Sequence, residues 1–266
     1  MGTASPQPTL SHLRQTLAEI DPSNAPRLAG AERLVGLADP INRALGGGLA
    51  CAALHELAPT TPIHLGATSG FALAVAARAS GERQVLWVTT DYAAGEGGGP
   101  YGPGLDLFGM ASARLLVLRV PKPVDVLWAM EEGLRCRALA CVIAEMTGEG
   151  AVADLTATRR LALAAREGVS AQNSGLGLLI RHKITDMPSA AATRWEIAPA
   201  LSQPDAYGGI CRARFDLSLC KNRRGPSGRW TIEWDHHERA FQPALSVGVA
   251  APALDRPDRA PLVRAG

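Results

Sequence analysis

Residues 53–80 read ALHELAPTTPIHLGATSGFALAVAARAS, which predicts a buried strand, a glycine-containing loop and then an apolar helix. This order is typical of nucleotide-binding α/β domains, in which a tight turn aims backbone amides and the positive end of a helix at an anion. The apolar residues of the helix recur at helical spacing, and their alanine-rich neighbours allow close contact with a sheet. The stretch therefore predicts the centre of an α/β fold.

The loop in this stretch lacks the groups that a phosphate loop needs. Such a loop has two glycines with four residues between them, then a lysine for the terminal phosphates and a serine or threonine for magnesium. Aligned on Gly70, the chain has Leu65 at the first glycine position, and Gly66 comes one residue late. Phe71 stands at the lysine position and Ala72 at the hydroxyl position. We therefore expect a degenerate phosphate loop in a non-catalytic protein without a cofactor or metal.

Length, composition and charge limit the function classes. A chain of 266 residues with 47% hydrophobic residues can bury one large core. Its net charge of +2 gives no reason to expect strong attraction to nucleic acid, so we expect protein partners. Five cysteines without CxxC spacing indicate neither a disulfide framework nor a zinc site. With no membrane-length apolar run and no signal-peptide core, we expect a cytoplasmic protein.

The chain divides into three expected parts. Residues 1–33 are expected to form an N-terminal helix and linker, residues 34–240 the α/β core, and residues 241–266 a disordered tail rich in Pro, Ala and Arg. The N-terminal helix, residues 9–20, has an apolar stripe that either packs back on the core or docks on another subunit. The stripe consists of Leu10, Leu13, Leu17 and Ile20.

Within the core, strand and helix patterns alternate, which predicts a mostly parallel twisted sheet with helices on both faces. After a short helix at residues 39–45 and the stretch quoted above, the strands are expected at residues 84–89, 115–120, 139–144 and 175–181, and the helices at 124–138 and 156–167. Residues 93–104 are expected to be a loop before a short helix at 105–108. Three alternating segments near the C-terminus predict antiparallel edge strands at residues 194–198, 213–219 and 229–234.

Several motifs in this order resemble the ImuA family. They are LVGLADPINRALGGGL, YGPGL, DVLWAMEEGLRC, LTATRRLALAA, SAAATRW and KNRRG with RWTIEWD, spread over residues 34–235. Their combination and order are specific, whereas each piece alone is weak. The resemblance implies a RecA-like P-loop NTPase core and an accessory role in the SOS response to DNA damage. The implied partners in error-prone translesion synthesis are ImuB and an error-prone C-family DNA polymerase; RecA is a further candidate, and DNA contact is expected to be indirect.

Two other functions remain open from the sequence. One is a RecA-like ATPase with an atypical phosphate loop, against which the missing lysine argues. The other is a cell division inhibitor of the SulA type, which is also a reduced RecA-like fold. The length of this chain and its KNR motif, residues 221–223, argue against that reading.

The KNR motif provides the second pair of partner-binding candidates, Lys221 and Arg223. It resembles the basic hairpin that in RecA filaments reaches the nucleotide of the neighbouring subunit. We expect this hairpin at an edge of the sheet. Its charges either solvate a turn or meet an acidic partner surface, since they exceed what a turn requires.

Other polar residues are expected to be structural. Glu145 ends an apolar strand where RecA-like ATPases hold a magnesium-coordinating acid, but without the lysine and hydroxyl we interpret it as a solvated carboxylate. Asp91 and Glu96 are expected to be ordinary loop acids, and His236 and His237 are not expected to bind a metal. No continuous basic stripe flanks the tryptophans, so we expect core or interface anchors at Trp128, Trp195, Trp230 and Trp234.

Overall fold

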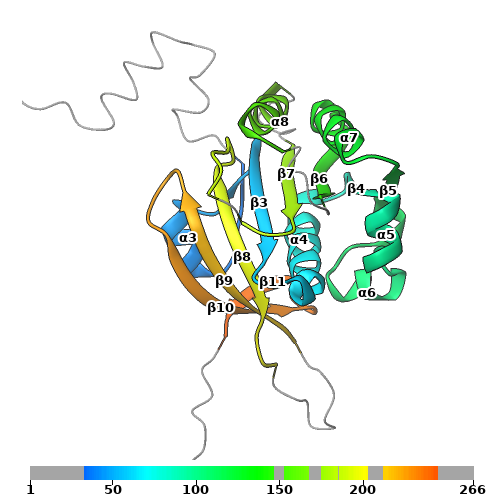
Figure 1. The fold of residues 1–266 in the computed structure, drawn as a ribbon. Helices are drawn as coiled ribbons and strands as arrows, with labels where there is room; N and C mark the ends of the chain where they lie inside the picture. The colour runs from blue at the N-terminus through cyan, green and yellow to red at the C-terminus, as the bar shows by residue number, and fades with distance from the viewer. Residues whose placement is uncertain (1–32, 147–152, 168–174, 185, 203–211, 245–266) are drawn as a thin grey trace, which may run out of the picture.

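The computed structural model describes residues 33–146, 153–167, 175–184, 186–202 and 212–244. Within these residues the main feature is a nine-stranded sheet with the order β11-β10-β9-β8-β3-β7-β6-β4-β5 (Figure 1). Its strands are β3 (Ala53–Pro59), β4 (Gln84–Thr90), β5 (Leu115–Val120), β6 (Leu139–Met146), β7 (Leu176–Arg181), β8 (Thr193–Pro199), β9 (Ala213–Asn222), β10 (Gly228–Asp235) and β11 (Ala240–Pro243).

The sheet is parallel from β8 to β5 and antiparallel from β8 to β11. β3 lies between β7 and β8, and its Glu56 is in register with Leu179 on one side and Arg194 on the other. β9 pairs antiparallel with β8 and β10, and β10 pairs antiparallel with β11. The predicted α/β fold, with a mostly parallel sheet and antiparallel strands near the C-terminus, is confirmed.

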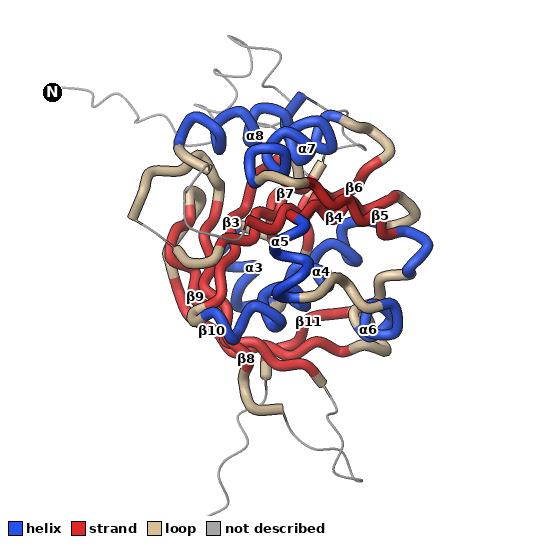
Figure 2. Tube along the Cα trace, turned by 45° about the vertical axis from the view of Figure 1, so that its right-hand side comes forward, coloured by secondary structure: helices blue, strands red, loops and turns tan. Residues whose placement is uncertain are grey.

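Helices cover both faces of the sheet (Figure 2). On one face lie α3 (Asp39–Leu45) and α4 (Leu65–Ser80), and on the other lie α7 (Pro123–Arg135) and α8 (Leu155–Glu167). Each face has its own cluster of buried apolar residues. The cluster under α4 includes Phe71, Trp195 and Trp234, whereas the cluster under α7 and α8 includes Leu54 and Leu161. A small ladder, β1 (Leu34–Val35) with β2 (Leu49–Ala50), lies outside the main sheet.

The first helix of the core shows how local sequence sets an element's limits. α3 carries Pro40 in its first turn, where a missing backbone N–H leaves no hydrogen bond unmade. It ends at Gly46, whose φ of 73° is left-handed and whose N–H bonds back to the carbonyl of Arg43. Glycine adopts this conformation without steric cost, so the predicted stop at the three glycines is confirmed.

Two expectations about short elements are wrong. Residues 93–104 were expected to be a loop, but α5 (Asp91–Gly97) and α6 (Gly102–Leu107) occupy most of them. α5 forms because the Thr90 hydroxyl accepts a hydrogen bond of 3.0 Å from the Ala93 N–H at its first turn. The tail was expected from residue 241, but β11 continues to Pro243 and Phe241 is buried. Residues 245–266 and the N-terminal helix expected at 9–20 lie outside the described residues.

None of the helices in the described part of the chain combines the length and the apolar character needed to span a membrane.

Candidate functional site

The phosphate-loop position is helical. A single 3-10 turn, η2 (Pro62–His64), follows β3, and α4 begins directly at Leu65. Gly66 and Gly70 therefore lie inside the helix, and the expectation that they belong to a loop is wrong. Only the first four N–H groups of a helix lack an intrahelical partner. The N–H of Gly70 is beyond that first turn, so it is not available to a phosphate.

Gly70 has a packing role. A Cβ atom added at Gly70 would lie 2.7 Å from the ring of Phe108, which follows α6. At Gly66, by contrast, an added Cβ would meet no atom within 4 Å. Glycine at position 70 thus allows an aromatic ring to approach α4 closely, which is the opposite of an open anion site.

Phe71 and Ala72, at the lysine and hydroxyl positions, belong to the core. Both side chains are fully buried. The Phe71 ring lies 5.8 Å between centroids from Phe215 and 5.4 Å from Phe241, so it joins α4 to β9 and β11. A residue at position 71 faces the hydrophobic interior, and a lysine there would have no route to a phosphate.

The carboxylates near the strand ends differ in their surroundings. Glu145, at the end of β6, is only 5% exposed, so the expectation of a solvated carboxylate is wrong. Burial raises the pKa of its carboxyl group above the ordinary value, and the nearby side chains of Thr89 and Trp87 offset only part of this rise. Asp91 and Glu96 are exposed on α5. Their helical placement differs from the loop that was expected.

The histidine pair after β10 forms part of a turn. The rings of His236 and His237 lie 4.0 Å apart between centroids. The Asp235 carboxylate accepts hydrogen bonds from the backbone N–H groups of His237 and Glu238, at 3.0 and 3.1 Å. Among the described residues, no group of three or more His, Cys, Asp or Glu side chains is placed to hold a metal ion.

The KNR hairpin is not at a lateral edge of the sheet, contrary to expectation. β9, which carries it, lies between β8 and β10, and β11 forms that edge. Asn222 at the end of β9 is in register with Thr193 at the start of β8. The hairpin therefore lies at the amino ends of the parallel strands, whereas the phosphate-loop position follows the carboxyl end of β3. The two features lie at opposite ends of the sheet.

The KNR residues differ in what they contact. Lys221 Nζ donates a hydrogen bond of 2.7 Å to the Ser189 carbonyl, and desolvation lowers the pKa of this amine. Asn222 Nδ2 donates to the Ala44 carbonyl at the end of α3, at 2.9 Å. The side chain of Arg223, in contrast, is exposed. Lys221 and Asn222 hold the hairpin in place, which leaves Arg223 as the exposed cation of the motif.

An ionic cluster on β3 was not predicted. Glu56 is completely buried, and it accepts hydrogen bonds from Arg181 Nη1 at 2.8 Å, from Ser189 Oγ at 2.8 Å and from Arg194 Nε. Arg181 also donates to the Ala153 carbonyl at 2.9 Å. A glutamate inside the apolar run ALHELAP was the available signal. Its partners follow 125 and 138 residues later, at no spacing that sequence reasoning could use.

This cluster anchors residues 186–192 to the sheet. The backbone N–H of Ala192 donates to the Leu54 carbonyl at 2.8 Å, and that of Ala190 donates to the Thr158 hydroxyl at 3.1 Å. Because Lys221 also binds Ser189, the same segment joins β3, α8 and the KNR hairpin. The arrangement is suited to positioning this stretch of backbone.

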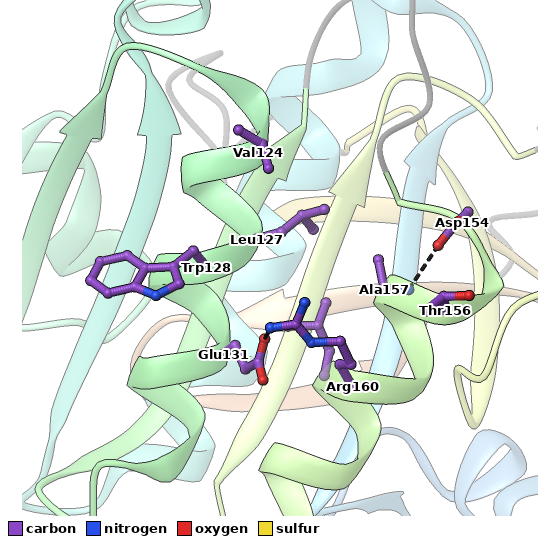
Figure 3. Close-up of a pocket in the computed structure, with 9 residues that line it drawn as sticks. Val124, Leu127, Trp128, Glu131, Asp154, Thr156, Ala157 and Arg160 are labelled. Atoms are coloured by element: carbon purple, nitrogen blue, oxygen red, sulfur yellow. Dashed lines mark hydrogen bonds and ion pairs between the residues drawn. The ribbon is translucent and has the colours of Figure 1, made fainter.

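A shallow groove of about 340 Å³ lies between α7 and α8 (Figure 3). The ion pair between Arg160 and Glu131, at 2.6 Å, crosses it. Trp128 on α7 also lines this groove, and it is 64% exposed (Figure 3). Trp128 is therefore no core anchor, whereas Trp195 and Trp234 are fully buried as expected.

The fold and the strand order define a RecA-like α/β protein. The solved structure of the RadB recombinase matches with a TM-score of 0.53, covering 78% of this chain and 97% of that chain. At 15% sequence identity, this likeness concerns the fold alone.

Sequence similarity is more specific than this likeness in fold, although no protein-family model matches the chain. It is 32% identical over 146 residues to the Protein ImuA of Caulobacter vibrioides, in strain NA1000 / CB15N and equally in strain ATCC 19089 / CIP 103742 / CB 15. The matched region is 50% of this chain and 55% of each relative, so the match spans about half the length of these curated relatives. This similarity supports an assignment to the ImuA family.

Proposed function

We propose that the chain is a non-catalytic, RecA-fold accessory protein of an SOS-type DNA damage response. In this proposal it supports error-prone translesion synthesis in the cytoplasm, together with ImuB and an error-prone C-family DNA polymerase. It contacts DNA through these partners. The similarity to Protein ImuA supports the pathway, and the packed phosphate-loop position supports the absence of catalysis.

The observation that carries the non-catalytic part is the burial of Phe71 within a helix that begins at Leu65. Phosphoryl transfer depends on a lysine and a metal ion that neutralise developing charge, and such groups supply several kcal/mol. At this position the chain presents a phenyl ring to the core.

We further propose that the chain keeps intersubunit surfaces of the RecA type without the nucleotide that regulates them. The exposed Arg223 and the phosphate-loop position lie at opposite ends of the sheet, as a head-to-tail contact with RecA or ImuB requires. The apolar stripe of the N-terminal segment, described above from sequence, provides a second contact. Charge-assisted bonds from the hairpin contribute orientation more than affinity.

The experiment measures capture of purified ImuB and RecA, together with damage-induced mutation frequency in complemented cells. We expect Arg223→Glu and deletion of residues 1–21 each to reduce capture and mutagenesis, while Arg229→Glu, at an exposed site on β10, has little effect. Lys221→Glu is a weaker test because it also breaks the bond to Ser189. Unchanged capture and mutagenesis in folded Arg223→Glu and deletion variants would contradict the interface proposal. If the unaltered chain neither captures ImuB nor restores mutagenesis, the accessory role itself is wrong.

A further inference from the structure

A polar pocket of about 770 Å³ lies at the C-terminal end of α4. Its walls come from the end of α4, from the segment around α6 and η3 (Ser112–Arg114), and from the turn between β10 and β11. α4 has 16 residues and is therefore about 24 Å long at 1.5 Å per residue. The pocket is thus separate from the phosphate-loop position at the other end of the same helix.

Three arginines line this pocket: Arg78, Arg114 and Arg239. Arg78 donates to two backbone carbonyls, to Gly36 at 2.9 Å through Nε and to Arg239 at 2.6 Å through Nη1. Among the described residues, neither Arg78 nor Arg239 forms an ion pair with a carboxylate. Two guanidinium charges therefore lie beside one cavity without a negative partner.

The third arginine is paired, but with an exposed partner. Arg114 Nη2 lies 2.5 Å from the Glu82 carboxylate, whose side chain is 91% exposed. Asp106, also exposed, is the other acid of the pocket lining. With three arginines and two acids the lining carries a net charge of +1, although the whole chain of 266 residues carries only +2.

Arg239 is held in an unusual conformation at this site. Its φ is 49°, in the left-handed region that residues other than glycine rarely adopt. Its side chain lies across Gly109, where an added Cβ would come within 3.2 Å of Arg239 Cδ. Gly109 thus leaves room for the Arg239 side chain. Arg78 in turn donates a hydrogen bond to the Arg239 carbonyl. The two unpaired cations are positioned together by backbone contacts.

We propose that this pocket binds the phosphate group of a small phosphate monoester. Guanidinium groups match the oxygens of a phosphate in geometry as well as in charge. The volume is within the range of small-molecule sites, roughly 300–1,000 Å³. A monoester carries about −1.5 to −2 charges at pH 7 and is a better match to unpaired arginines than a singly charged phosphodiester. The compact cavity and the low net charge of the chain favour this ligand over a nucleic-acid strand.

The test is calorimetric titration of the full chain with inorganic phosphate, glycerol phosphate and adenosine monophosphate, and separately with an oligonucleotide that lacks terminal phosphates. The monoesters are expected to bind, and Arg239→Gln and Arg78→Gln are each expected to weaken binding about tenfold. Asp106→Asn is expected to tighten binding, because it removes a negative charge from the lining. Arg229→Gln, on an exposed arginine outside the pocket, is the matched control and is expected to bind as the unaltered chain does.

Arg78→Gln also removes two hydrogen bonds to the backbone, so circular dichroism is used to verify its fold. If Arg78→Gln unfolds, Arg239→Gln decides the test, because the Arg239 side chain makes no hydrogen bond or ion pair within the described structure. The proposal is overturned if no monoester binds or if binding is unchanged in Arg239→Gln. It is also overturned if only the oligonucleotide binds, because the site then recognises phosphodiesters.

Discussion

The two faces of β3 are built by different physical means. On the α4 face, Leu57 lies in an apolar core that includes Phe71 and Trp195. On the α8 face, Glu56 is buried among arginines. Successive residues of one strand thus point to a hydrophobic core and to an ionic cluster. Beside α4 an apolar core buries Phe71 at the position of the phosphate-loop lysine, whereas on the opposite face buried charge fixes a segment of backbone.

The ionic face is expected to give the largest effect. Glu56→Gln leaves the guanidinium groups of Arg181 and Arg194 buried without a carboxylate, which should lower the free energy of unfolding by roughly 3–5 kcal/mol. Urea unfolding measures this change. The control is Glu82→Gln, which breaks an exposed pair with Arg114 and should cost less than about 1 kcal/mol. Equal effects of the two substitutions would mean that the buried cluster contributes little to stability.

On the apolar face, Phe71→Ala removes a ring that contacts Phe215 and Phe241. It should lower the free energy of unfolding by about 3 kcal/mol, from lost burial and from the cavity left behind. Leu163→Ala on α8 is the control, because Leu163 is 54% exposed. An unchanged melting temperature in Phe71→Ala would show that the ring is not part of the core.

A buried histidine on β3 makes stability depend on pH. His55 Nε2 lies 2.9 Å from the Ala50 carbonyl and donates to it, so Nδ1, 2.7 Å from the Thr193 hydroxyl, is an acceptor in the neutral ring. Burial lowers the pKa of His55 from 6.5 to about 4. In the unfolded chain His55 therefore binds a proton as the pH falls below 6.5. In the folded chain it binds that proton only at about pH 4. Stability is full above pH 6.5 and falls by roughly 3 kcal/mol as the pH drops towards 4.

Urea unfolding of the unaltered chain and of His55→Asn at several pH values isolates this contribution, because other titrating groups are common to both proteins. The difference in unfolding free energy between the two should shrink as the pH falls from 6.5 to 4. A difference that stays constant over this range would contradict a neutral buried His55.

The two glycines of α4 give the smallest and most specific contrast. Gly70→Ala places a Cβ against the ring of Phe108 and should destabilise the protein by roughly 1–2 kcal/mol. Gly66→Ala has open space and should stabilise the helix by about 0.5–1 kcal/mol. Thermal unfolding measures both. Destabilisation by both substitutions would argue that the segment is not a regular helix.

The sequence predicted much of this architecture because most core strands are apolar runs of ordinary length. β6 and β7 were placed within two residues, and the stop of α3 was predicted from its glycines. α5 was missed because its segment is rich in glycine, although Thr90 was an available cap signal. β11 was missed because four residues carry too little pattern. Its pairing with β10 and the contact of Phe241 with Trp234 stabilise it instead.

The candidate site was less predictable. The motif spacing identified which phosphate-loop groups are missing, but it could not show that α4 begins at Leu65. The KNR hairpin was placed at the wrong part of the sheet because strand order cannot be read from one sequence. Arg181 and Arg194 were overlooked since each meets Glu56 only through tertiary contacts. The exposure of Arg223 compared with Lys221 likewise depends on the packing of Ser189.

In the proposed function, the phosphate-loop position binds no nucleotide. Its most direct test is a titration of magnesium-ATP into the Arg239→Gln variant, in which the pocket at the far end of α4 is weakened. We expect no saturable magnesium-dependent binding and no hydrolysis. Sub-micromolar affinity that persists in this variant would contradict it, because a helix that begins at Leu65 and buries Phe71 would then have to open to accept the nucleotide.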